Sequence, residues 1–237
     1  MRTAHRDWPT QKRRSLMHSQ APSPSFLHPP ATAGPGLLLV LCGPSGAGKG
    51  TVVAGLLSRG EQAGYQLAFS VSMTTRPMRP GEVEGRSYFF VTREAFESRL
   101  REEGFLEHAE YAGHLYGTPR PPVEQALAAG QVVLLEIDLQ GALQIKRTYP
   151  DAVMVFLMPP SFEELEQRLR RRGTETPDVI EKRLAIAREE HRGAHEFTYY
   201  VSNAAVSEAV SDLDGIIRAE RCKLRRLCPG GIPQDHP

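Results

Sequence analysis

One stretch of the sequence constrains the fold more than any other: residues 37–53 read LLLVLCGPSGAGKGTVV. Six apolar residues lead into a glycine-rich turn, and a segment suited to a helix follows, so the order strand, loop, helix is predicted. The spacing Gly43-x-x-x-x-Gly48-Lys49 is typical of a loop whose backbone N–H groups surround a phosphate chain, with a lysine close to the outer phosphates. Such a loop at the end of a buried strand favours an α/β fold.

Four short apolar runs are nearly continuous rather than alternating, which indicates strands with both faces covered by helices. Helical patterns lie between them along the chain. We therefore predict a P-loop three-layer αβα core with a parallel sheet and right-handed crossovers. The predicted strands are residues 37–42, 132–137, 153–158 and 199–201.

Three of the helical segments have readable ends. One begins near Ser161 with a capping box and ends at Gly173, and the next is opened by Thr176 with a proline at its first position. The last begins at about Ser207. The apolar positions that repeat along one face, and that are predicted to point inward, are Leu165 and Leu169, then Ile180, Leu184 and Ala187, then Val210, Leu213, Ile217 and Leu224.

The first 35 residues are proline-rich and basic, with five Lys or Arg against one Asp. They are predicted to be disordered, because they cannot bury enough surface to offset the entropy lost on ordering. Their composition weakly resembles a transit peptide, and the plainer alternatives are a loose extension or a start at Met17. Residues 36–237 are predicted to form one domain.

Charge and composition argue against several classes of protein. The formal net charge of +1 for the whole chain leaves residues 36–237 slightly acidic, which argues against a broad nucleic-acid-binding surface. No apolar run approaches the ~20 residues of a membrane-spanning helix. The three cysteines match neither a disulfide framework nor a zinc spacing, so we expect a reducing, cytoplasmic location.

The residue after Lys49 is Gly50, where this motif normally supplies a hydroxyl for magnesium, and Thr51 follows it. If Gly50 offers no ligand, Mg²⁺ must be held mainly by phosphates, waters and a carboxylate elsewhere, which suits a cation that sheds water reluctantly. The ending GKGT also occurs in adenylate kinases. The loop alone therefore indicates a nucleotide kinase without choosing which one.

Residues 71–118 interrupt the alternation of strands and helices and are predicted to form an inserted lobe, with one short helix from Thr92 to about Glu103. In this segment Arg76 and Arg79 lie three apart among Ser and Thr hydroxyls. Two guanidinium forks suit a terminal phosphate, which accepts bidentate hydrogen bonds. Each of these residues alone is compatible with an ordinary exposed turn.

The motif S-x-x-T-R-x-x-R-x-G-E-x-x-G-x-x-Y is followed by YGT at 116–118, EIDLQGA at 136–142 and IIRAER at 216–221, and with these motifs the chain resembles the guanylate kinases. The resemblance runs from about Leu37 to Leu227. It implies ATP-dependent phosphorylation of GMP to GDP with Mg²⁺, and ATP and GMP as small-molecule partners. The first motif comprises Ser72, Thr75, Arg76, Arg79, Gly81, Glu82, Gly85 and Tyr88.

By this resemblance, one group of side chains in the lobe holds the phosphate of GMP and another reads its base. Guanine presents N1–H and its 2-amino group side by side, a pair of donors that one carboxylate can accept. Adenine would leave Glu107 buried and unpaired. The phosphate group is held by Arg76, Arg79, Tyr88 and Tyr116, and the base is read by Ser72, Glu107 and Thr118.

Glu136 and Asp138 close an apolar strand and, being two residues apart, point to the same side of the sheet. Ligands bind at this end of parallel strands, so one of the two is the natural acid on the metal side. The family usually has Asp at the first position, and two alternatives stay open for Glu136, a contact with GMP or a place around the metal. Asp138 is expected to reach the metal through water. The plainer alternative is two solvated acids.

The remaining expected site residues surround ATP. Arg168 and Arg172 lie four residues apart on one face of a predicted helix, where like charges repel each other, although cations near the carboxyl end of a helix are favoured. The resemblance assigns them to a lid, about 161–194, whose cations reach the transferring phosphoryl group. No general base is needed, since the phosphate of GMP is largely dianionic at pH 7. The catalytic residues implied are Lys49, Arg168, Arg172 and Arg183, and the ATP-binding residues are Gly43, Pro44, Ser45, Gly46, Ala47, Gly48, Lys49, Gly50, Thr51 and Asn203, the last of which is expected to touch the adenine.

Two other functions are compatible with part of these features. Another nucleoside monophosphate kinase would share the GKGT ending. Guanylate kinase-like domains also serve as non-catalytic peptide-binding modules, which tend to lose residues of the phosphate loop and lid. The presence of Lys49, Arg76 and Arg172 favours the enzyme.

Overall fold

The computed structural model describes residues 36–60, 63–171 and 176–227. The predicted disorder of residues 1–35 and the predicted helix end at Gly173 lie outside these residues. None of the helices in the described ranges combines the length and the apolar character needed to cross a bilayer.

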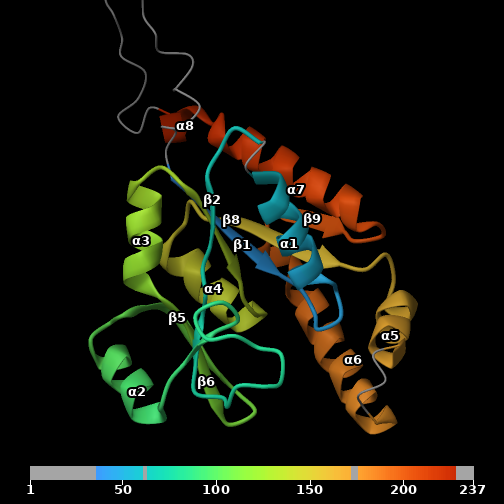
Figure 1. Cartoon of the computed structure of the whole chain (residues 1–237). Coiled ribbons are helices and arrows are strands. Elements are labelled where there is room, and N and C mark those ends of the chain that lie inside the picture. The colour runs from blue at the N-terminus through green and yellow to red at the C-terminus, as the bar shows by residue number, and fades with distance from the viewer. Residues whose placement is uncertain (1–35, 61–62, 172–175, 228–237) are drawn as a thin grey trace, which may run out of the picture.

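A five-stranded sheet forms the centre of the molecule, in the order β2-β7-β1-β8-β9 (Figure 1). Every neighbouring pair in it is parallel, so the predicted α/β core with a parallel sheet is confirmed. The sequence prediction missed β2, which has only three residues, all half-buried, and so gives no apolar run. The strands are β1 (Leu37–Cys42), β2 (Leu67–Phe69), β7 (Val132–Glu136), β8 (Val153–Met158) and β9 (Tyr199–Ser202).

Helices cover both faces of this sheet, with α1 and α7 on one side and α3 and α4 on the other (Figure 1). Successive β1 residues alternate between the two faces: Leu39 packs with the α1 and α7 side, and Val40 with the other. Both side chains are fully buried, which accounts for the continuous apolar run. The helices are α1 (Lys49–Gly60), α3 (Arg120–Ala128), α4 (Leu139–Thr148), α5 (Phe162–Arg171), α6 (Pro177–Arg192), the 3₁₀ turn η1 (Gly193–Glu196), α7 (Val206–Arg221) and α8 (Leu224–Leu227).

A second sheet, in the order β4-β3-β6-β5, lies beside the first and carries one helix, α2. Its small core consists of Met73, Phe96, Phe105 and Leu115, with the two phenylalanine rings stacked at 4.3 Å between centroids. This sheet and the α5–α6 pair extend from the same end of the central sheet, at lower left and lower right in Figure 1. Its elements are β3 (Met73–Thr74), β4 (Phe89–Phe90), α2 (Arg93–Arg101), β5 (Phe105–Tyr111) and β6 (His114–Pro119).

The inward positions predicted for the last helix are correct for Val210, Leu213 and Ile217, which are buried, and wrong for Leu224, which is 56% exposed. The helix α7 ends at Arg221, and Cys222 caps it with its backbone N–H bonded to Ala219. The chain then turns and begins the short helix α8, so the periodicity that connects Ile217 to Leu224 in the sequence is broken.

This difference predicts unequal effects of two truncations. We expect Ile217→Ala to lower the free energy of unfolding by about 2–5 kcal/mol, because it leaves a cavity between α7 and the sheet. Leu224→Ala should lower it by less than about 0.5 kcal/mol, because the side chain is largely in water. Urea unfolding of both variants measures the two values, and similar losses would contradict the end of α7 at Arg221.

Candidate active site

The loop between β1 and α1 has a backbone that only glycine can form. Gly43, Gly46 and Gly48 have φ values of 152°, 92° and 89°. A Cβ on Gly43 would lie 2.0 Å from the carbonyl oxygen of Leu157, and one on Gly48 would lie 2.5 Å from Nδ2 of Asn203. The loop is therefore seated directly against the ends of β8 and β9, as a rigid concavity at the start of α1.

Lys49, the first residue of α1, folds back over this loop. Its ammonium donates to the carbonyl oxygens of Gly43, at 2.6 Å, and Pro44, at 3.3 Å. The charge thus lies across the mouth of the loop, where phosphate oxygens can replace the carbonyl oxygens as acceptors.

Two of the predicted lid arginines reach the loop. Arg183, on α6, donates from Nη1 to Oγ of Ser45 at 2.7 Å. Arg168, on α5, donates from Nη1 to the carbonyl oxygen of Ala47 in the loop at 3.4 Å and from Nη2 to that of Asn203 at 2.9 Å, while its Nε donates to Glu164 at 2.7 Å. The structure therefore brings α5 and α6 onto the phosphate loop. Arg172 lies outside the described residues.

Asn203, predicted to touch adenine, lies behind the loop and is only 2% exposed. Its Nδ2 donates to the carbonyl oxygen of Ala47 at 2.7 Å, so the side chain supports the loop. Among the described residues, no hydrogen-bond partner exists for its Oδ1, which leaves a buried acceptor beside the loop.

The two acids at the end of β7 have different environments. Glu136 pairs in register with Leu41, next to the loop, and burial raises the pKa of its carboxyl, with the Lys49 charge acting in the opposite direction. Asp138 caps α4, with its Oδ1 accepting the backbone N–H of Gly141 at 2.8 Å. One oxygen of Asp138 thus has a structural role that the sequence analysis did not foresee.

A third acid, Glu190 on α6, was missed by the sequence analysis. It is half-buried, and burial raises its pKa, while the charges of Lys49 and Asp138 act on it in opposite directions. A sequence signal for it existed, because Glu190 continues at helical spacing the buried stripe that ends at Ala187. An acid at the end of an inward-facing stripe points to a partly buried site.

The described residues include no cluster of three or more His, Cys, Asp or Glu side chains that could cage a metal ion. Gly50 is exposed, and a Cβ added there would contact nothing within 4 Å. Mg²⁺ keeps several waters and binds through one or two carboxylates together with phosphates. Glu136 and Asp138 next to Lys49 fit that mode of binding.

The second sheet holds a buried acid–hydroxyl pair. Glu107 on β5 and Thr118 on β6 are cross-strand partners, 5% and 1% exposed, and Thr118 Oγ1 donates to Glu107 Oε1 at 2.6 Å. Burial raises the pKa of Glu107 to about 7, and the Thr118 hydrogen bond opposes this shift. Ser72 immediately precedes Met73, which pairs with Gly117, the residue before Thr118, so the third predicted base-reading residue lies close to this pair along the sheet.

Gly141 on α4 lies against this pair, since a Cβ there would be 2.4 Å from Oε2 of Glu107. Gln144, one turn further along α4, binds the backbone of His108 in both directions. The carboxylate of Glu107 is therefore enclosed between the second sheet and the first turn of a core helix.

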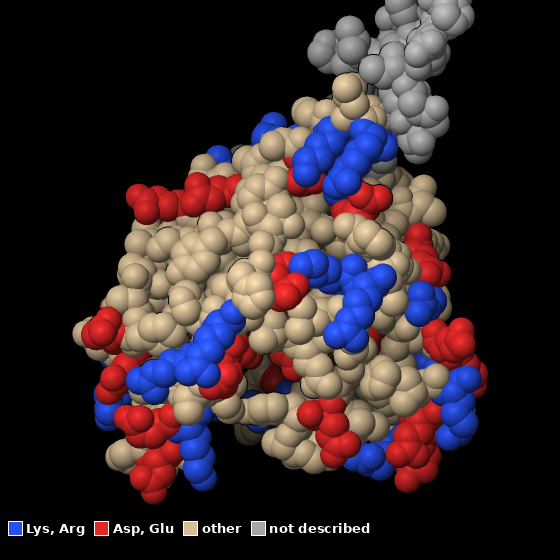
Figure 2. Space-filling model, turned by 180° about the vertical axis from the view of Figure 1, so that it is seen from behind, with Lys and Arg blue, Asp and Glu red and all other residues tan. Residues whose placement is uncertain are grey.

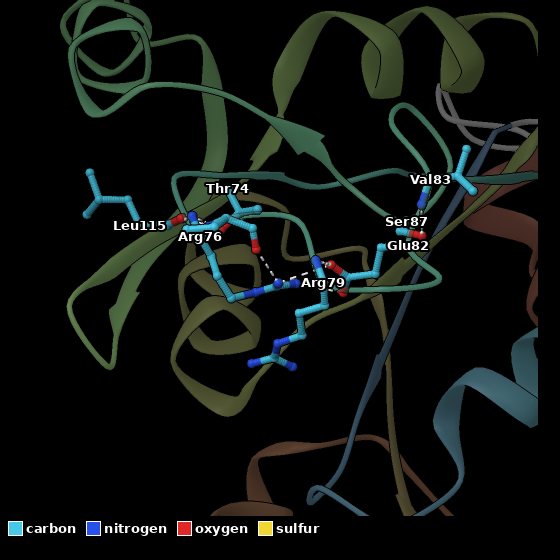
Figure 3. Close-up of polar contacts among 8 residues, drawn as sticks. Thr74, Arg76, Arg79, Glu82, Val83, Ser87 and Leu115 are labelled. Atoms are coloured by element: carbon cyan, nitrogen blue, oxygen red, sulfur yellow. Dashed lines mark hydrogen bonds and ion pairs between the residues drawn. The ribbon is translucent and has the colours of Figure 1, made fainter.

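Arg76 is 8% exposed, and its guanidinium lies 5.4 Å from the ring centroid of Tyr88. The rings of Tyr88 and Tyr116 meet edge to face at 6.0 Å. Arg79 is exposed, and its guanidinium extends away from Glu82 into the open (Figure 3). Three of the four residues predicted to hold a phosphate thus form a contiguous group, with the fourth reaching outward beside them.

The space-filling view shows a hollow on the lower part of the molecule, with charged side chains of both signs at its rim (Figure 2). The phosphate loop and lid lie on one side of the end of the central sheet, and the second sheet lies on the other. This arrangement can hold two phosphorylated ligands facing each other, with cations from Lys49, Arg183 and Arg79 available to anionic oxygens.

A model of the guanylate kinase family matches residues 36–220. A guanylate kinase of Thermus thermophilus is 55% identical over 192 residues, which cover 81% of this chain and 85% of that protein. The guanylate kinase of Desulfitobacterium hafniense is 48% identical over 191 residues, covering 81% and 94%. The crystal structure of guanylate kinase from Anaplasma phagocytophilum superposes with a TM-score of 0.67 at 35% identity and covers 83% of this chain and 92% of that one.

The environment of Glu107 predicts how stability depends on pH. Because its pKa is higher in the folded protein than its ordinary value, folding is favoured most when the carboxyl is protonated, and its contribution becomes unfavourable as the pH rises from about 5 through 7. We expect Glu107→Gln to be more stable than the parent protein at pH 8, by a few kcal/mol at most, and this gain to shrink toward pH 5.

Thermal unfolding of both proteins between pH 5 and pH 9 measures this difference. Glu97→Gln, which removes a carboxyl that is 44% exposed, is the control. A gain for Glu107→Gln that stays constant across the range would show that the carboxyl does not titrate in it.

Proposed function

The chain belongs to the guanylate kinase family, which phosphorylates GMP to GDP with ATP, and we propose that the residues assembled at this end of the sheet carry that reaction. The observation that carries the assignment is the buried Glu107–Thr118 pair on the sheet that also carries Tyr116, with Arg76 just after β3 and Tyr88 just before β4. A carboxylate enclosed in this way needs donors, and a purine monophosphate that offers two donors on its base and an anion at its other end fits both groups.

Recognition of the base rests on Glu107 in its ionised form. The N1–H and 2-amino groups of guanine donate to its two oxygens, while Thr118 and Ser72 contribute hydroxyls. Adenine offers an acceptor at N1, which would face the carboxylate and leave it unpaired in a buried position. The penalty for that mismatch is the source of selectivity for GMP.

The phosphate of GMP is held by Arg76, Arg79, Tyr88 and Tyr116. The pKa of Tyr88 is raised mainly by burial, so the phenol stays protonated and donates a hydrogen bond. The phosphate then attacks as a largely dianionic oxygen nucleophile, and no side chain has to remove a proton first.

The phosphates of ATP lie in the loop Gly43–Gly48 and its continuation through Thr51. Lys49 exchanges the loop carbonyl oxygens for the outer phosphates, and Arg183, already at Ser45, neutralises charge on the transferring group together with Arg168 and, by family resemblance, Arg172. Asn203 acts from behind the loop, which it supports through its hydrogen bond to Ala47; the contact with adenine expected from the resemblance would require its buried Oδ1 to become exposed.

Magnesium would be held by the ATP phosphates and, through water, by Glu136 and Asp138. When bound, it supplies positive charge to the bridging and outer phosphate oxygens. Glu136 lies within reach of both substrate sites, since its carboxyl interacts electrostatically with Lys49 in the phosphate loop and with Tyr88 on the GMP side, and we keep it as a GMP contact as well as an acid near the metal.

We further infer that residues 71–118 act as a GMP-binding lobe and residues 161–194 as a lid, within one domain from residue 36 onward. Closure of both over the substrates would exclude water, which otherwise accepts the phosphoryl group. The few cysteines and the slightly acidic charge of this part favour a cytoplasmic enzyme that binds no nucleic acid.

Turnover of GMP, AMP, CMP and UMP with ATP and Mg²⁺ tests the function directly. We expect kcat/KM for GMP to exceed that for AMP by at least about 10³, because the buried carboxylate rejects a base without the two donors. A clear preference for AMP would support another nucleoside monophosphate kinase. If no heat of ATP binding appears in calorimetry, the chain is a non-catalytic peptide-binding module.

Lys49→Ala tests the phosphate loop. We expect kcat to fall by about 10²–10³ or more, with KM for GMP little changed, since the lysine contacts the loop and not the second sheet. Lys146→Ala, which removes an exposed lysine paired with Glu196, is the matched control. Near-normal turnover of the Lys49 variant would contradict its role.

A further inference from the structure

Glu82 lies between the two arginines proposed above to hold the phosphate of GMP. Its Oε1 accepts from Nη2 of Arg76 at 2.7 Å, and its Oε2 accepts from Nη1 of Arg76 at 3.0 Å (Figure 3). The same Oε2 accepts the backbone N–H of Arg79 at 2.8 Å. One carboxylate therefore fixes the side chain of the first arginine and the backbone of the second.

The hydrogen bonds of Arg76 leave one edge of its guanidinium for a ligand. Of the five N–H donors of a guanidinium, two on Nη1 are taken by Pro77 and Glu82, and one on Nη2 is taken by Glu82. The rings of Tyr88 and Phe90 lie 5.4 and 5.8 Å from its carbon. The Tyr116 side chain also interacts with this guanidinium. The Nε–H and the Nη2–H that Pro77 and Glu82 do not use point along one edge, the bidentate geometry that two phosphate oxygens accept.

The carboxylate is itself held by the local backbone. Glu82 follows a turn in which its N–H bonds to the carbonyl oxygen of Arg79 at 3.1 Å and Gly81 has a φ of 86°. On the other side of the pair, the backbone N–H of Arg76 donates to Oγ1 of Thr74, which in turn donates to the carbonyl oxygen of Leu115 on β6. The ion pair thus connects a rigid turn to the sheet (Figure 3).

We propose that Glu82 is a positioning residue for GMP: it directs the Nε and Nη2 edge of Arg76 at the phosphate and fixes the point from which Arg79 extends. This inference rests on the proposed function. The carboxylate stays on the guanidinium when the substrate binds, because the phosphate uses the adjacent edge and N–H groups that Glu82 does not occupy. A carboxylate that instead occupied the donors used by the phosphate would have to leave the guanidinium when GMP binds. Replacing Glu82 should raise KM for GMP in the first arrangement and lower it in the second.

Glu82→Gln tests this difference, because glutamine keeps the size and one acceptor oxygen but loses the bidentate ionic contact. We expect KM for GMP to rise by roughly ten- to hundredfold, with a smaller change in kcat and none in KM for ATP, since the misplaced fork lies on the GMP side. The inhibition constant of guanosine, which lacks the phosphate, should not change. Glu97→Gln, another acid of this lobe paired with an arginine but 44% exposed, is the matched control.

Several results would overturn the inference. They are a fall in KM for GMP, an unchanged KM for GMP, or an equal loss of affinity for GMP and for guanosine. The last result would mean that the lobe is disordered rather than that its arginine is misaligned. Circular dichroism and thermal unfolding verify the fold, and Glu82→Asp, which keeps the charge one methylene short, should give an intermediate KM if the glutamine variant does not fold. A parent protein without GMP turnover overturns the proposed function and this inference with it, whereas turnover with an unaffected Glu82 variant overturns this inference alone.

Discussion

The close approach of Gly43 to the carbonyl oxygen of Leu157 is the constraint on which the nucleotide end of this structure depends. It seats the phosphate loop on the end of β8, the strand from which the chain continues into α5. The contact of Asn203 with Ala47 repeats this arrangement at the end of β9. Short contacts thus connect the loop to the strands, and the arginines of α5 and α6 complete the arrangement through Ala47 and Ser45.

In the second sheet, the arrangement of the buried side chains depends on how their charges are paired, because an unpaired charge is costly to bury. Isolated ionised groups in a protein interior are strongly unfavourable, so each one needs a partner with good geometry. Arg76 has Glu82 and two aromatic rings, whereas within the described ranges Glu107 has the hydroxyl and backbone of Thr118, no ion-pair partner, and a raised pKa. The lobe therefore presents one charge that is already satisfied and aimed, and one that lacks a charged partner. This asymmetry suits a site where the arginine is a fixed anchor and the acid inspects the base.

The sequence predicts the fold well where burial is continuous and poorly where it is partial. Four central strands follow from apolar runs, while β2, with three half-buried residues, leaves no pattern. The sequence indicated a turn at Arg79-Pro80-Gly81, but the ion pair of Arg76 with Glu82 depends on the left-handed backbone of Gly81 in that turn, which no periodicity reveals. Leu224 was misplaced because a cap at Cys222 interrupts the helix, and Glu190 was overlooked because its register was interpreted only for apolar residues.

The contact of Gly141 with Glu107 joins two parts that otherwise have separate tasks. Gly141 belongs to α4, a helix of the central core whose amino end is capped by Asp138, whereas Glu107 belongs to β5 of the second sheet. Any side chain larger than hydrogen at this position would push against the inspecting oxygen. If Glu107 reads the base as proposed, selectivity would depend partly on a glycine of the neighbouring helix, whose missing side chain leaves room for that carboxylate.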